Sequence, residues 1–132
     1  WCRGHNAKKK SGLLSSHYEV MIHNGKKSTG KKVADWVKEL ERIGVGEIVI
    51  NSIDHDGKME GYDEQLVELV RKNCSVPITI LGGAGSVDHF KKMINHYKII
   101  GVAAGSFFVF KGKYRAVLIS YPNEAQRKEL YY

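Results

Sequence analysis

The sequence predicts one α/β domain, residues 1–132, equivalent to the C-terminal half of a (β/α)8 barrel. From Val33 onward, short apolar runs typical of strands buried in a parallel sheet alternate with segments of helical periodicity. Two turns of small residues follow two consecutive predicted strands, an arrangement typical of the last loops of such barrels. The chain has 132 residues, whereas a complete barrel of this class needs about 250 residues.

The predicted elements follow one another in strand–helix order. Strands are predicted over residues 18–23, 47–51, 76–81 and 99–103, and helices over residues 33–43, 63–70, 86–97, 107–110 and 123–130. Asp63 and Ser86 are typical N-cap residues, and Asn24-Gly25 is a typical hairpin turn. Repeated strand–helix–strand units imply right-handed crossovers and therefore a parallel sheet. Residues 1–16 are basic with little apolar content, and they predict no clear strand.

The composition limits the partners that we expect. A formal charge of +7 suits an anionic small molecule such as a phosphate ester. The lysines are scattered and no base-stacking motif accompanies them, so we expect no nucleic-acid partner. Cys2 and Cys74 lie far apart and form no metal or redox motif, which favours a reducing cytoplasm, no metal and no cofactor. The chain has neither a signal peptide nor an apolar run of the ~18 residues that a membrane span needs, so we expect no membrane partner.

Two turns are candidate phosphate sites. Gly82-Gly83-Ala84-Gly85-Ser86 follows a predicted buried strand and opens a helix, where glycines let backbone N–H groups approach an anion. Ala103-Ala104-Gly105-Ser106 follows the next strand and precedes a short helix. In (β/α)8 enzymes the loops after the last two strands often bind one phosphate together. The alternative is a pair of tight strand–helix turns without a ligand.

A third candidate segment is Asn51-Ser52-Ile53-Asp54-His55-Asp56-Gly57, at the C-terminal end of a predicted strand. Strand ends of such sheets carry catalytic residues, so Asp54 and Asp56 could act as general acid or base or orient ligand hydroxyls. The alternative is a polar turn, which also requires such residues. Ser52, Asp54 and His55 are the residue types of a catalytic triad, but neighbours in sequence rarely form one.

Several motifs in this order resemble those of HisF, the cyclase subunit of imidazole glycerol phosphate synthase. They are residues 23–30, 35–40, 46–57, 61–63, 82–85 and 103–106, and the resemblance covers about residues 17–120. Residues 105–122 are closer to the HisF-like paralogues of bacterial surface-polysaccharide pathways. Those paralogues partner a glutamine amidotransferase and use its ammonia to build an amidino group on a sugar.

The resemblance implies a TIM-barrel lyase whose last two loops hold a substrate phosphate, here at Gly82, Gly83, Ala104, Gly105 and Ser106. It also implies that Asp56 matches the family's catalytic acid at the end of strand six. Asn51 and Ser52 match neighbouring positions that line the pocket. Independently of the resemblance, the place of Asp54 at the strand end makes it a further candidate substrate-binding residue.

The strand-five position departs from the family pattern. The best match to the family's second catalytic aspartate is Asn6, in His5-Asn-Ala-Lys-Lys9. An amide cannot take up a proton as a carboxylate does, which argues against general acid/base catalysis at this position.

Three functions remain open at this point. The first is a half-barrel that binds phosphorylated ligands, forms a homodimer or higher homo-oligomer, and has weak or no cyclase activity. The second is one part of an amidotransferase-coupled synthase whose other half lies on another chain. The third is a non-enzymatic interaction module. The amide at Asn6 and the absence of the counterparts of strands one to four of the family's barrel favour the first or the third function. Asp56 and the two small-residue turns favour the first or the second function.

Overall fold

The computed structural model describes residues 2–11, 16–97, 101–112 and 114–130. The strands are β1 (Cys2–Ser11), β2 (Ser16–Ile22), β3 (Lys27–Lys32), β4 (Glu47–Ser52), β5 (Ile78–Leu81), β6 (Gly101–Val102), β7 (Phe110–Lys111) and β8 (Ala116–Val117). The helices are α1 (Val33–Ile43), α2 (Glu64–Asn73), α3 (Val87–Tyr97), α4 (Ser106–Val109) and α5 (Glu124–Lys128). The predicted α/β organisation is confirmed, with helices between successive parallel strands.

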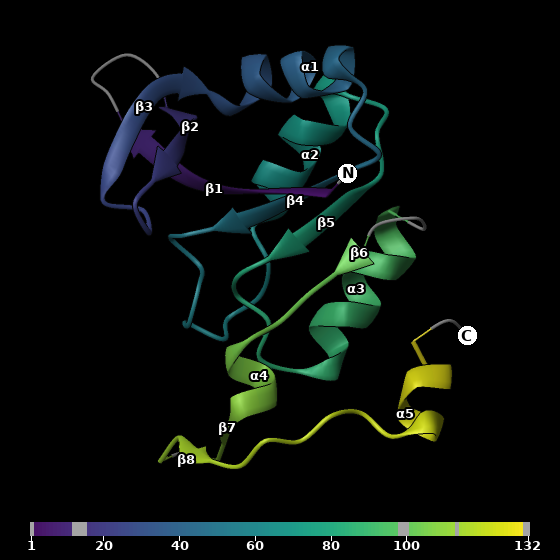
Figure 1. Ribbon diagram of the computed structural model, residues 1–132. Coiled ribbons are helices and arrows are strands. Elements are labelled where there is room, and N and C mark those ends of the chain that lie inside the picture. The colour runs from purple at the N-terminus through teal and green to yellow at the C-terminus, as the bar shows by residue number, and fades with distance from the viewer. Residues whose placement is uncertain (1, 12–15, 98–100, 113, 131–132) are drawn as a thin grey trace.

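Six strands form one sheet in the order β3-β2-β1-β4-β5-β6, and β7 and β8 form a separate hairpin. The neighbours β1, β4, β5 and β6 are parallel, whereas β2 and β3 are antiparallel additions at the β1 side. Figure 1 shows α1 and α2 side by side along the sheet, with α3 next to β6. The four parallel strands with their helices therefore have the arrangement of half a (β/α)8 barrel.

The hydrophobic core lies between one face of the sheet and these helices. The strands contribute Ile48 and Ile50 from β4 and Ile78 and Ile80 from β5, all buried. Each helix contributes apolar side chains from successive turns of one face, namely Val33, Val37, Leu40, Leu66, Val67, Val70, Phe90 and Met93. The helical and strand periodicities that predicted these elements thus match their buried faces.

The sequence left open whether residues 1–16 form a strand, and in the structure Cys2–Ser11 forms β1 near the middle of the sheet. Its first part pairs with β4 from Cys2 opposite Glu47 to Ala7 opposite Ser52. From Asn6 onward it also pairs with β2 on its other side. The lysines lie on the part that extends past the core, where Lys9 is exposed. This strand is specified by pairing on both sides, which apolar periodicity does not detect.

Other boundaries also differ from the predictions. Strand β3 was not predicted because its residues are polar and almost all exposed, and the β7–β8 hairpin was not predicted either. The predicted Asn24-Gly25 turn is confirmed: both residues have positive φ, and Lys26 N donates to His23 O at 3.2 Å. The strand predicted over 99–103 is described only at Gly101–Val102, since residues 98–100 lie outside the described residues.

The predicted helix caps are confirmed. Asp63 accepts a hydrogen bond from Leu66 N at 3.1 Å, and Ser86 Oγ accepts one from His89 N at 3.3 Å. The short helix begins at Ser106 rather than Phe107, and the last helix spans only Glu124–Lys128 within the predicted 123–130. No helix within the described residues is long and apolar enough to cross a membrane.

The face of the sheet opposite the helices would face the interior of a complete barrel. Along β4 and β5 it carries Glu47, Val49, Asn51, Thr79 and Leu81, all half-buried. Thr79 Oγ1 donates to Glu47 Oε1 at 2.6 Å. This face therefore mixes polar and apolar side chains, whereas the helix-covered face of the same strands is apolar up to Ser52.

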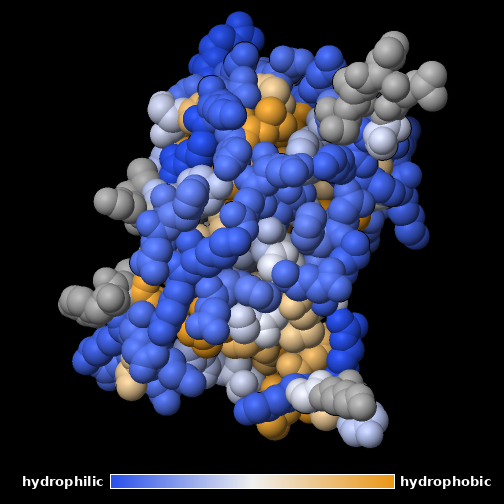
Figure 2. Space-filling model, turned by 180° about the vertical axis from the view of Figure 1, so that it is seen from behind, coloured by the Kyte–Doolittle hydropathy of each residue, from blue (hydrophilic) through white to orange (hydrophobic). Residues whose placement is uncertain are grey.

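The exposed apolar side chains lie elsewhere, chiefly on the segment that follows β7. Tyr114, Val117, Ile119 and Tyr121 are each at least 66% exposed, and Leu118 is 54% exposed. In Figure 2 this end of the molecule, at the bottom of the view, carries a visible hydrophobic area. The chain then continues to α5. Glu129, directly after α5, forms an ion pair with Lys91 of α3, with 3.3 Å between Oε2 and Nζ.

Candidate functional site

The predicted site residues come together at the C-terminal ends of the four parallel strands. In the sheet register Asn6 lies opposite Asn51, and Asn51 lies opposite Leu81, which precedes the first glycine turn. Ala103 N donates to Ile80 O at 2.9 Å, so the second turn leaves the sheet directly beside the first. The two turns and both asparagines therefore share one end of the sheet.

Asn6 and Asn51 form a pair of amide side chains across β1 and β4. Asn51 Nδ2 donates to Asn6 Oδ1 at 3.2 Å. Asn51 Oδ1 is buried and has no hydrogen-bond partner within the described part of the chain. The catalytic position proposed for Asn6 thus presents an amide, already paired with a second amide.

The glycines of the first turn are required by close packing, whether or not a ligand binds. Gly82 and Gly83 have φ values of +92° and +111°, which side chains rarely adopt. A Cβ on Gly82 would lie 2.6 Å from Ser52 O, and one on Gly83 would lie 2.0 Å from Gly61 O. Gly61 N also donates to Gly83 O at 2.8 Å. This turn is therefore held tightly against the loop that follows β4.

The second turn is more open. A Cβ on Gly105 would meet no atom within 4 Å, and Gly105 has a negative φ of −106°. Gly105 precedes α4, and its carbonyl accepts a hydrogen bond from Phe108 N at 3.0 Å. Tyr62 OH donates to Ala103 O at 2.7 Å, and burial raises the pKa of Tyr62, which keeps this hydroxyl protonated. The loop after β4 thus contacts both turns.

The two candidate aspartates of that loop have different surroundings. Asp54 Oδ2 accepts a hydrogen bond from Lys9 N at 2.7 Å, and Ile53 N donates to Ala7 O at 3.0 Å. These bonds continue the pairing of β1 with β4 beyond the sheet, so Asp54 has a clear structural role. Asp56 is exposed, and its carboxylate makes no hydrogen bond within the described residues. It is therefore accessible to a ligand.

Ser52 does not line the mouth, contrary to the prediction. Side chains alternate along a strand, so Ser52 lies on the helix-covered face with Ile50, whereas Asn51 lies on the opposite face. The Ser52 side chain is buried, and its Oγ donates to Asp63 Oδ2 at 3.1 Å.

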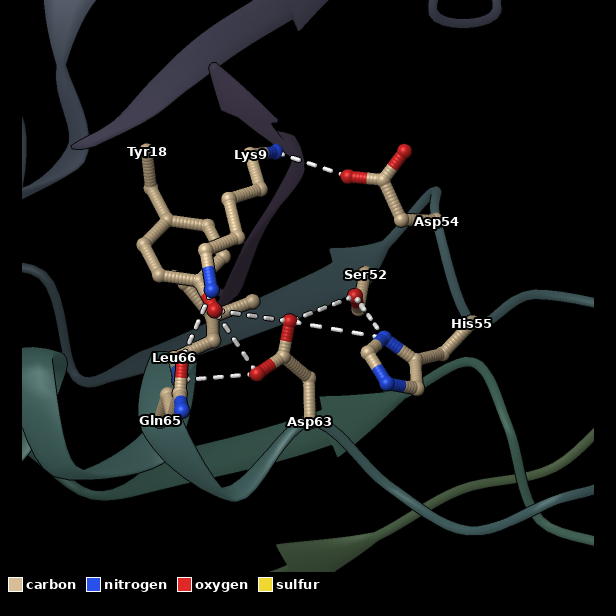
Figure 3. Close-up of polar contacts among 8 residues, drawn as sticks. All are labelled: Lys9, Tyr18, Ser52, Asp54, His55, Asp63, Gln65 and Leu66. Carbon is tan, nitrogen blue, oxygen red and sulfur yellow. Dashed lines mark hydrogen bonds and ion pairs between the residues drawn. The ribbon is translucent and has the colours of Figure 1, made fainter. Parts of the chain in front are cut away.

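Ser52 belongs to a buried polar network centred on Asp63 (Figure 3). Tyr18 OH lies 2.8 and 3.0 Å from the two carboxylate oxygens of Asp63. His55 Nδ1 lies 3.1 Å from Ser52 Oγ and 3.4 Å from Asp63 Oδ2. Burial, and then the hydrogen bond to Asp63, raise the pKa of Tyr18.

This network is not a nucleophilic triad. One nitrogen of His55 faces both Ser52 and Asp63, and the serine hydroxyl is bound to the carboxylate itself rather than directed at a substrate. Sequence reasoning identified Asp63 only as a helix cap and did not identify Tyr18, because no local pattern links residues 45 positions apart. No group of three or more His, Cys, Asp or Glu side chains among the described residues could hold a metal ion.

Comparison with known proteins adds the family. Residues 5–115 match the family model described as "Histidine biosynthesis protein". The chain belongs to this family. It is 54% identical over 122 residues to the protein named "Putative imidazole glycerol phosphate synthase subunit HisF" of Leptospira borgpetersenii. The aligned region covers 92% of this chain and 48% of that relative. It is 39% identical over 94 residues to the imidazole glycerol phosphate synthase subunit HisF of Natranaerobius thermophilus. That alignment covers 71% of this chain and 38% of the relative.

The chain spans about half the length of these HisF relatives or less, and it corresponds to a C-terminal half of HisF or of a HisF-like protein. The family match contains every predicted site residue from Asn6 to Ser106. It ends at residue 115, so the exposed apolar segment of residues 117–121 lies beyond it.

Proposed function

We propose that this HisF-like half-barrel binds phosphorylated small-molecule ligands at the turns Gly82–Ser86 and Ala103–Ser106. The observation that supports the proposal is that both turns leave adjacent parallel strands at the end of the sheet that also holds Asn6 and Asn51. Each turn precedes a helix, and helix N-termini favour anions. The relatives are named for a phosphate ester, which agrees with this chemistry.

We propose that the ammonia-dependent cyclase activity of this chain by itself is weak or absent. The amide of Asn6 cannot act as a general acid or base, which leaves Asp56 as the candidate for that role. Asp56 is exposed, so bulk water surrounds its carboxylate. Efficient catalysis would require further protein around the site that excludes bulk water.

Two free sheet edges support a partner half-barrel. Beside Cys2–His5, on the side away from β4, the described residues provide no strand, and β6 also has no further neighbour among them. We propose a second copy of this chain as the partner, in a homodimer or higher homo-oligomer.

A second candidate function is an active synthase completed by a half-barrel on another chain and supplied by a glutamine amidotransferase subunit. A non-enzymatic interaction module would bind neither phosphate nor a substrate.

A phosphate titration followed by NMR tests the proposed ligand site. Inorganic phosphate should shift the backbone amides of both turns. Ser106→Asp places a negative charge at the start of α4, where an acidic residue suits the helix, and should weaken phosphate binding about tenfold or more. Ser106→Asn is the matched neutral control and should retain binding. Unchanged amides in the native chain, or equal binding by both variants, would contradict the proposal.

Turnover requires a separate experiment. The chain is mixed with a HisF N-terminal half and assayed with ammonia in place of glutamine. Turnover in the mixture supports the two-chain synthase, whereas phosphate binding without turnover supports the binding function alone.

A further inference from the structure

A pocket of about 270 Å³ lies between the start of α3, the short helix α4 and the segment that follows the β7–β8 hairpin. Figure 1 shows α4, this hairpin and the chain that leads to α5 together at the bottom of the view. We call it the hairpin pocket, and its walls include Met59, Val87, Phe107, Lys111, Tyr121 and Gln126.

The hairpin pocket is separate from the proposed phosphate site. Among the described residues of the two turns, Gly85 alone lines it, whereas Gly82, Gly83, Ala104 and Ser106 do not. The walls supplied by residues 120–126 lie beyond the family match, which ends at residue 115. The pocket therefore depends on a part of the chain that lies outside the match.

Aromatic side chains form much of the wall. Phe107 packs edge-on against Phe90, with 5.2 Å between the ring centroids, and Tyr121 lies 5.2 Å from the ring of Phe108. These contacts hold both rings in place, yet Tyr121 remains 74% exposed. Aromatic rings stack on flat ligand rings, and exposed apolar side chains beside a hollow are typical of ligand sites.

The polar groups of the wall are hydrogen-bond donors. Lys111 is the only charged residue among the described residues that line the pocket, and it has no ion-pair partner among them. Gln126 Oε1 accepts a hydrogen bond from Asn123 N at 2.9 Å, which fixes the side chain and leaves its Nε2 group without a partner in the described chain. An ammonium and an amide N–H group suit a carboxylate, which only accepts hydrogen bonds.

We infer that the hairpin pocket binds a small aromatic acid, that is, one flat ring that carries a carboxylate. The ring would lie against Phe107 and Tyr121, and the carboxylate would face Lys111 and Gln126. The volume is slightly below the range of about 300–1,000 Å³ that is typical of pockets for larger ligands, so a single-ring compound fits it. This site does not depend on the proposed function.

Benzoate, cyclohexanecarboxylate and benzamide are suitable probes at neutral pH. The second keeps the charge of benzoate without its flat ring, and the third keeps the ring without the charge. Their binding is followed by NMR through the side-chain signals of Met59 and Tyr121. Benzoate should bind about three- to tenfold tighter than either other probe.

Two variants test the charge preference. Lys111→Gln removes the ammonium, and Gln126→Glu keeps an acceptor for Asn123 N but places a carboxylate in the wall. Each should remove the preference for benzoate over benzamide. Lys38→Gln, on the exposed side of α1, changes the net charge equally and is the matched control that should retain this preference.

A third variant tests the ring. Tyr121→Leu should bring the affinities for benzoate and cyclohexanecarboxylate close together, whereas Tyr114→Leu, at a 91% exposed position outside the pocket wall, should leave their ratio unchanged. The backbone amide spectrum of each variant checks its folding. Equal binding of the three probes to the native chain, or the same benzoate preference in Lys111→Gln as in Lys38→Gln, overturns the inference.

Inorganic phosphate is titrated separately on the same samples. Phosphate shifts at the two turns without a benzoate preference remove this inference and leave the proposed function intact. A benzoate preference without phosphate shifts at the turns supports the hairpin pocket and removes the proposed function.

Discussion

Replacing Tyr18 by phenylalanine removes one hydroxyl from the buried Asp63 network and should lower the free energy of unfolding by about 1.5–2 kcal/mol. The hydroxyl carries one proton, so its two contacts of 2.8 and 3.0 Å count as one hydrogen bond to a charged group. Such bonds contribute about 1.5–3 kcal/mol. Asp63 keeps Ser52 Oγ and Leu66 N as donors in the variant, so it is not left as an unpaired buried charge. The lower part of that range is therefore expected.

Urea unfolding of the native chain and of three tyrosine variants measures this effect. Tyr114 is 91% exposed, so Tyr114→Phe is the matched control and should change the free energy by less than about 0.5 kcal/mol. Tyr62→Phe removes a hydrogen bond to the neutral carbonyl of Ala103 and should cost about 0.5–1.5 kcal/mol. If Tyr18→Phe is as stable as Tyr114→Phe, the network does not stabilise the fold and the argument fails.

The pH dependence provides an independent check on Tyr18. Its pKa is raised in the folded state above the ordinary tyrosine value of about 10. Above about pH 10 the unfolded chain loses a proton that the folded chain keeps, so stability falls as the pH rises, whereas below that pH this contribution is fully present. Tyr62 shows the same direction of shift. Tyr18→Phe should therefore reduce the alkaline loss of stability without abolishing it.

Three further predictions follow from the same geometry. Gly83→Ala should lower the free energy of unfolding by about 2–4 kcal/mol, because its Cβ would clash with Gly61 O, whereas Gly105→Ala should be nearly neutral; equal unfolding midpoints would contradict this. Asp56→Asn should lower any ammonia-dependent turnover of the mixed half-barrels by about 10²–10⁴-fold and leave phosphate shifts unchanged, and a fully active variant would end its assignment as acid or base. Light scattering at micromolar concentration should give a mass above the 14.9 kDa of one chain, and a well-behaved monomer would exclude the homo-oligomer.

The sequence predicted those elements whose own side chains form the core. Strand β4 and helix α1 were recognisable because their apolar residues recur at the spacing of the faces that they bury. Strands β1 and β3 were not, because β3 is polar and almost all exposed, and β1 carries a run of lysines whose place in the sheet depends on pairing with β2 and β4. That information lies in distant parts of the chain.

The candidate site shows the same limit. The position of Asn51 and of both turns at strand ends followed from the order of the elements, and the register then brought Asn6 beside Asn51. The direction of Ser52 depended on which residue of β4 faces the helices, and its assignment to the mouth was wrong for that reason. The role of Gly83 as a packing residue required the structure, since the atom that it contacts belongs to a loop 22 residues earlier, at Gly61.

The unequal pairing of β1 has a consequence for assembly. The β2–β3 hairpin occupies the outer edge of β1 from Asn6, opposite Met21, onward. An incoming strand can therefore align only beside Cys2–His5 and has to leave the sheet before it reaches Met21. A shift by one residue would turn every side chain of the incoming strand to the opposite face. In the assembly that we propose, the hairpin would therefore set the length and the alignment of any strand that joins at this edge, although the hairpin itself is not part of the barrel.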